Sequence, residues 1–77
     1  MSRVDELQKA IDENFQSLRD LYGQASGLKK IIDETKSQKT RQQLQSYYEG
    51  VMETFGKHVD ITGKLIEALQ KVIREET

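Results

Sequence analysis

The chain has 77 residues with a formal net charge of −1, and 35% of them are hydrophobic, so it can form one small domain that favours self-association or a partner. The absence of cysteine excludes disulfides and thiolate chemistry within the chain. No apolar run approaches the roughly 18 residues that span a bilayer, and residues 1–10 lack the apolar segment of a signal peptide, so we expect a cytoplasmic protein with no membrane contact.

The first predicted element is a helix over residues 3–35. Apolar side chains recur at alternating intervals of three and four, and eight of the ten heptad core positions from Val4 to Thr35 are apolar. Ser2 is suited to cap the start of this helix, because Asp5 follows three residues later and places negative charge in the first turn.

The stretch "YGQASGLKK" holds two glycines, Gly23 and Gly27, inside this helix. The heptad phase passes through both without a shift, which favours a continuous helix, although each glycine costs about 1 kcal/mol relative to alanine. Three interpretations stay open: a bend or local fraying with no binding role, close packing of a partner backbone against the glycines, and a break that divides the helix.

A polar turn over residues 36–39 is expected next, and Thr40 with Gln43 has the pattern of a capping box for the following helix. Residues 28–41 carry five basic and two acidic side chains, a net charge of +3, whereas residues 1–27 and 42–77 each carry −2. This basic segment is the basis of an alternative function, nucleic-acid binding through phosphate contacts. The residues concerned are Lys29, Lys30, Lys36, Lys39 and Arg41.

The second predicted helix, over residues 40–75, has an apolar face too wide for one neighbour. One seam consists of Leu44, Val51, His58, Leu65 and Val72, and a second of Met52, Val59, Ile66 and Ile73; both share Tyr48, Phe55, Thr62 and Leu69. A single antiparallel helix covers only one such seam. A second copy of the chain or a helix of another protein must therefore cover the remaining apolar residues.

These elements predict an all-α fold: a single domain formed by an antiparallel helical hairpin that dimerises into a four-helix bundle. In the expected register Asn14 lies opposite Thr62, and this polar layer would penalise slipped pairings. His58 is expected one layer away, at the edge of the seam. The arrangement resembles that of plasmid-encoded RNA-binding hairpin dimers of the Rop type, in the helical arrangement alone, which implies a phage or bacterial accessory regulator.

The sequence offers no catalytic constellation, cofactor motif or metal-ligand cluster. We therefore expect a non-enzymatic protein–protein interaction module, a regulator, inhibitor or adaptor that acts as a homodimer and binds a further protein. The residues expected on its self-association or partner face are Phe15, Tyr22, Ile31, Tyr48, Met52, Phe55, Val59, Ile66 and Ile73.

Overall fold

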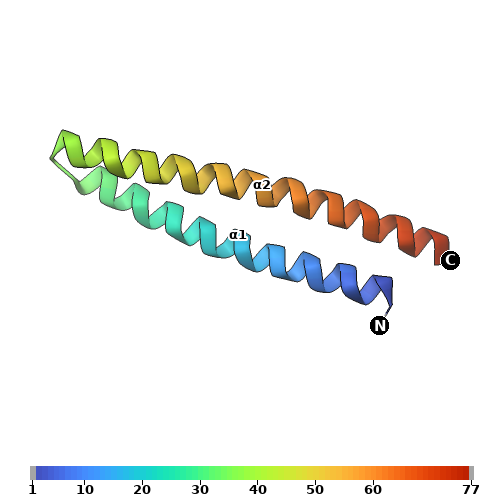
Figure 1. The fold of residues 1–77 in the computed structure, drawn as a ribbon. Helices are drawn as coiled ribbons and strands as arrows, with labels where there is room; N and C mark the ends of the chain where they lie inside the picture. The colour runs from blue at the N-terminus through green and yellow to red at the C-terminus, as the bar shows by residue number, and fades with distance from the viewer. Residues whose placement is uncertain (1, 77) are drawn as a thin grey trace.

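Two long helices account for most of the chain. The computed structural model describes residues 2–76, in which α1 spans Arg3–Glu34 and α2 spans Gln38–Glu76. The helices lie side by side in opposite directions and are joined at one end by residues 35–37 (Figure 1). This confirms the expected all-α antiparallel hairpin. Neither helix is long and apolar enough, within the described residues, to cross a membrane.

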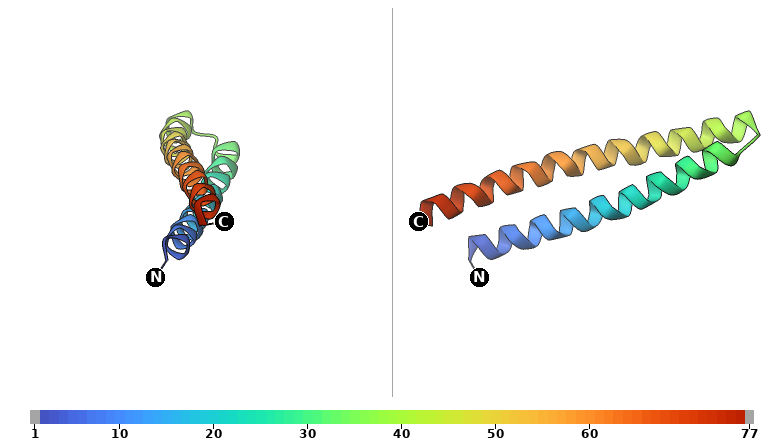
Figure 2. Two further views of the ribbon diagram at one scale, coloured as in Figure 1. Left: turned by 90° about the vertical axis from the view of Figure 1, so that its right-hand side faces the viewer. Right: turned by 180° about the vertical axis from the view of Figure 1, so that it is seen from behind.

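The hairpin is a rod of 59 × 15 × 14 Å, and the two helices stay adjacent along its length (Figure 2). Its core is the single seam between α1 and α2. All ten heptad core positions from Val4 to Thr35 are buried or half-buried. The same holds for the first α2 seam, counted with the four positions that it shares with the second seam. The most buried side chains are those of Ile11, Ala25, Ile32, Thr62 and Val72. The heptad pattern therefore identified the packed side of each helix.

The start of α1 is capped as expected. Ser2 has an extended backbone, and its Oγ accepts a hydrogen bond of 3.1 Å from the backbone N–H of Asp5. The carbonyl of Ser2 accepts the first helical bond, from Glu6. Asp5 and Glu6 place carboxylates near the positive end of the helix dipole, which stabilises this end.

The turn is shorter than expected, and α2 begins two residues before Thr40. Ser37 Oγ accepts from the backbone N–H of Thr40 at 3.3 Å, so Ser37 takes the capping role that the sequence assigned to Thr40. Gln38 and Lys39 are good helix formers, and the helix therefore extends back to the earlier capping side chain. On the other side of the turn, the extended backbone of Thr35 ends α1, and its Oγ1 donates to the carbonyl of Ile31 at 2.6 Å.

α1 is continuous through Gly23 and Gly27, so the interpretation that a break divides this helix is wrong. Neither glycine has a positive φ. A Cβ added to either one would have nothing within 4 Å, so the hairpin itself does not require glycine at these positions.

Replacing Gly23 and Gly27 by alanine should stabilise the hairpin, each by up to about 1 kcal/mol, because alanine loses less backbone entropy in a helix. Urea unfolding followed by far-UV circular dichroism measures the change at a fixed protein concentration. A loss of stability would show that another backbone packs closely against these residues.

Candidate protein-interaction face

The apolar residues beside the seam lie on two different sides of the hairpin. Residues nine positions apart on an α-helix are half a turn round its axis from each other. Ile31 therefore lies on the opposite side of α1 from Tyr22, and Ile61 on the opposite side of α2 from Met52. Tyr22 and Met52 line the same hollow between the helices, so they belong to one side.

We define the broad face as the apolar residues on the side of this hollow, and the narrow face as those on the other side. The broad face consists of Phe15, Tyr22, Met52, Val59, Ile66 and Ile73. The narrow face consists of Ile31, Tyr47 and Ile61. The structure thus separates Ile31 from the other residues expected on one interaction surface, and it places Tyr48 and Phe55, also expected there, half-buried in the seam.

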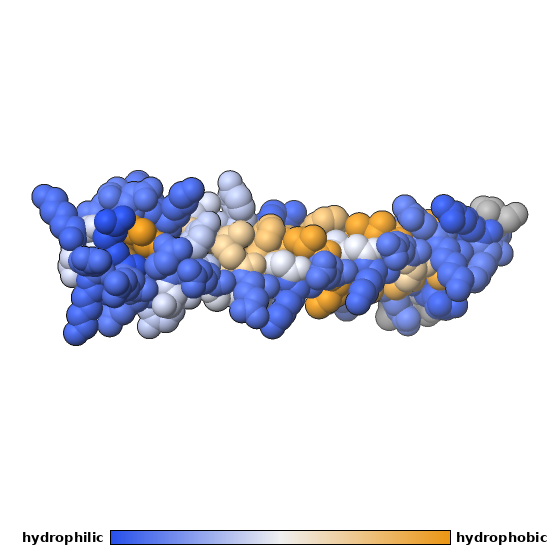
Figure 3. Space-filling view, turned by 90° about the horizontal axis from the view of Figure 1, so that it is seen from above, coloured by the Kyte–Doolittle hydropathy of each residue, from blue (hydrophilic) through white to orange (hydrophobic). Residues whose placement is uncertain are grey.

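Most of the broad face is open to solvent. Phe15, Tyr22, Met52, Val59 and Ile73 are exposed, Tyr22 by 67%, and only Ile66 is half-buried. Seen from above in Figure 3, an apolar strip runs along the middle of the molecule between hydrophilic borders. Scattered apolar residues on a surface are ordinary, whereas these residues form a row at heptad spacing on one side of the hairpin.

The hollow on the broad face has a volume of about 310 Å³. Its lining comes from both helices: Tyr22, Ala25, Ser26 and Lys29 of α1, and Tyr48, Met52 and Phe55 of α2. Ala25 and Ser26 belong to the small-residue stretch between Gly23 and Gly27. Their short side chains leave α1 recessed opposite the larger side chains of α2, so this stretch shapes the surface of the broad face.

A polar layer crosses the seam at Asn14. Its Nδ2 donates to the carbonyl of Ala10 at 2.9 Å, which leaves Oδ1 as the acceptor for His58 Nδ1 at 3.0 Å. This assigns the proton of a neutral His58 ring to Nδ1. The hydroxyl of Thr62 donates to the carbonyl of His58 at 2.7 Å. Asn14, His58 and Thr62 thus form one connected polar layer.

The side chain of Asn14 is thus bonded to His58, which was expected one layer away. That Asn14 and Thr62 lie at the same level of the seam stays a prediction. A signal for the bond to His58 was present, because a threonine inside a helix commonly donates to the carbonyl four residues earlier. The Thr62 hydroxyl is used in that way, and His58 is the next polar side chain along the seam. No buried polar side-chain atom in the described residues lacks a hydrogen-bond partner.

The five basic residues near the turn do not gather in one hollow. Lys36 and Arg41 line a hollow of about 380 Å³ at the turn, together with Ile32 and three glutamines. Lys29 lines a different hollow, which the acidic residue Asp33 also lines. Lys30 and Lys39 are exposed and line neither hollow.

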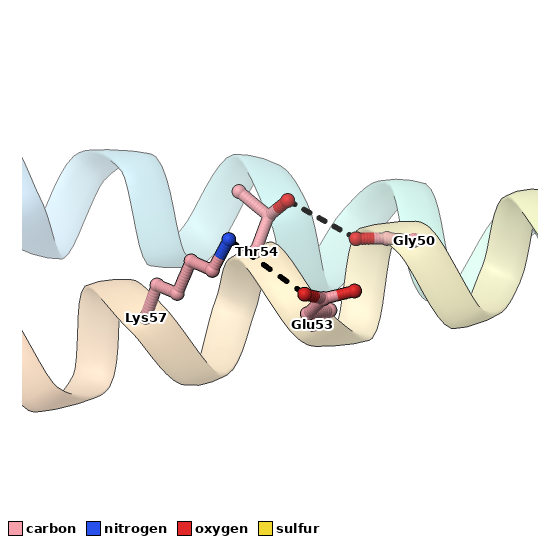
Figure 4. A network of polar contacts seen from close by, with 4 residues as sticks. All are labelled: Gly50, Glu53, Thr54 and Lys57. Atoms are coloured by element: carbon pink, nitrogen blue, oxygen red, sulfur yellow. Dashed lines mark hydrogen bonds and ion pairs between the residues drawn. The ribbon is translucent and has the colours of Figure 1, made fainter.

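The outer surface of α2 carries ordinary solvated polar contacts. Lys57 Nζ lies 3.6 Å from Glu53 Oε1, and Thr54 Oγ1 donates to the carbonyl of Gly50 at 3.0 Å (Figure 4). Both charged side chains are about 70% exposed, so the ion pair contributes little to stability. Among residues 2–76 no three histidine, aspartate or glutamate side chains are grouped so as to hold a metal ion.

Comparison with protein families, with curated proteins and with solved structures gives no match. The broad face and the polar layer are thus interpreted from their own geometry.

The bond between Asn14 and His58 predicts energetic coupling. The free-energy changes of Asn14→Ala and His58→Leu should deviate from additivity in the double variant by about 0.5–1.5 kcal/mol, since either change alone leaves the other group without its partner. Urea unfolding at one fixed protein concentration measures this. Asn14→Ala with Leu28→Ala is the control pair and should be additive, because the two residues lie four helical turns apart. Additivity in the first pair would contradict the assignment.

Proposed function

We propose that the chain is a non-enzymatic protein–protein interaction module that acts as a homodimer of helical hairpins. The observation that carries the proposal is the broad face, a row of exposed apolar side chains that the hairpin does not cover. Both helices contribute to this row, as expected for a face that packs against another helical pair in a bundle.

The exposed area of the hairpin supports this proposal. The chain exposes 5989 Å², whereas a compact monomer of its mass, 8.9 kDa, exposes about 4800 Å². The excess, roughly 1200 Å², is larger than the about 800 Å² that each partner contributes to an interface of standard size and lies in the range of obligate homodimers. Its radius of gyration, 17.4 Å, is likewise well above the about 11 Å of a compact domain of this length.

The narrow face is the proposed site for a further protein. Dimerisation through the broad face leaves Ile31, Tyr47 and Ile61 in solvent, and Tyr47 is 67% exposed. Tyrosine is enriched at interfaces because its large ring loses little conformational entropy on binding. A homodimer carries two copies of this face, which suits an adaptor or an inhibitor that binds a target protein.

Nucleic-acid binding through the basic turn is less well supported. The distribution of Lys29, Lys36 and Arg41 over two hollows, with Asp33 in one of them, gives no continuous basic track for a phosphate backbone. The broad face has no role in such contacts.

Two matched substitutions test the proposal. Val59 and Ile61 are 46% and 45% exposed, stand two residues apart on α2, and lie on different faces. Val59→Asp should dissociate the dimer, because it places a charge in the apolar interface, whereas Ile61→Asp should leave it intact. Sedimentation equilibrium over about 1–200 µM protein measures both, a range that brackets micromolar dimerisation. A monomeric unsubstituted chain over this range would contradict the proposal, as would equal effects of the two changes.

A further inference from the structure

We infer that the broad face is covered by a second copy of the chain in antiparallel orientation, with α2 along α2 of the partner subunit and the two turns at opposite ends of the bundle. This inference rests on the homodimer proposed above and adds its topology and its contacts.

The charge distribution along the rod favours this orientation. The turn end carries the +3 of residues 28–41, whereas the rest of the chain carries −4. Asp5, Glu6, Glu75 and Glu76 lie near the other end, all of them exposed. A dimer with both turns together would place two +3 segments side by side. The antiparallel dimer separates them and brings each near the other end of the partner subunit, where residues 3–9 and 67–76 carry five acidic and four basic side chains.

The Asn14–His58 bond locates the two-fold axis. Because this bond joins the helices at 3.0 Å, the next residues, Phe15 and Val59, lie at about the same level, and both belong to the broad face. An axis across the rod at this level places each of them against its own copy. Met52 and Ile66 lie one heptad before and after Val59, so Met52 of one chain meets Ile66 of the partner subunit.

The same two-fold axis brings oppositely charged residues together at the outer edge of the broad face. On α1, Asp12 lies three residues before Phe15 and Arg19 lies four residues after it, so each carboxylate faces a guanidinium of the partner subunit. Both side chains are exposed in the single hairpin. An axis parallel to the rod would instead place this edge of α1 against α2 of the partner subunit.

On α2, the corresponding edge positions are glycines. Gly56 lies three residues before Val59 and Gly63 four residues after it, so the axis brings Gly56 opposite Gly63 of the partner subunit. Neither has a positive φ, and a Cβ added to either would have nothing within 4 Å in the single hairpin. Val59 and Gly63 also line a shallow hollow on α2. Close approach of the two α2 helices accounts for glycine at both positions.

The absence of native cysteine allows a direct measurement of the orientation. Gln43→Cys places one spin label on an exposed residue near the turn. In the antiparallel dimer, the two labels should be separated by about 48 Å along the bundle, which is 32 residues of helical rise. With the turns together, they should be within roughly 20 Å, the width of two helix layers. Double electron–electron resonance distinguishes these distances.

Disulfide formation provides a second readout. Val59→Cys should oxidise to a covalent dimer, because a disulfide needs Cα atoms within about 7 Å and the axis places the two copies of residue 59 together. Ile61→Cys is the matched control and should oxidise at least about tenfold more slowly. A long label distance with rapid oxidation of Val59→Cys supports the inference. A short label distance in a chain that sediments as a dimer would overturn the orientation and leave the proposed function standing. A monomeric chain would overturn both.

The glycine pair gives a further matched test. Gly63→Gln should raise the dimer dissociation constant by at least about tenfold, because the added side chain separates the α2 helices. Gly27→Gln, on the outer side of α1, should leave it unchanged. Sedimentation equilibrium measures both variants, and equal dissociation constants would contradict the contact between Gly56 and Gly63.

Discussion

The structure depends on one constraint: two antiparallel helices can share only one seam. Each helix presents one stripe of side chains to the other, and within residues 2–76 no large side chain is completely enclosed. Hydrophobic burial in a single hairpin is therefore limited. The exposed apolar residues on either side of the seam keep 39–67% of their surface in solvent, and their full burial requires another molecule. The proposed interaction role follows from this geometry of packing.

The polar layer shows how such a narrow seam can keep its register. An apolar seam at heptad spacing can slip by seven residues and still bury similar side chains. The bond between Asn14 and His58 has no equivalent after such a slip, and each group would lose its partner in a half-buried position. Apolar residues supply most of the burial, and we expect this bond to favour one register over the slipped ones.

The heptad pattern was sufficient to predict the helices, their antiparallel packing and the continuity of α1 through Gly23 and Gly27, because each is a consequence of one long-range periodicity. Local choices were harder to predict. Ser37 and Thr40 are both capable caps, and the outcome depends on whether Gln38 and Lys39 join the helix. The bond to His58 depended on the direction of individual side chains. The separation of Ile31 from Tyr22 follows from the angular positions of the two residues on one helix, so a helical-wheel projection of this helix is enough to predict it.

The three-residue connection has a consequence for chain exchange. Helical hairpins can open and exchange one helix with a second chain, and a short connection without glycine or proline can readily become helical. In this chain the angular positions of the α1 and α2 seams oppose the exchange of helices. If α1 continued as a helix into α2, the twelve residues from Ile32 to Leu44 would place Leu44 about 120° round the helix axis from Ile32, so the two seams would point in different directions. A single neighbouring helix could not then cover both seams, so the reversal at residues 35–37 protects the closed hairpin against domain swapping.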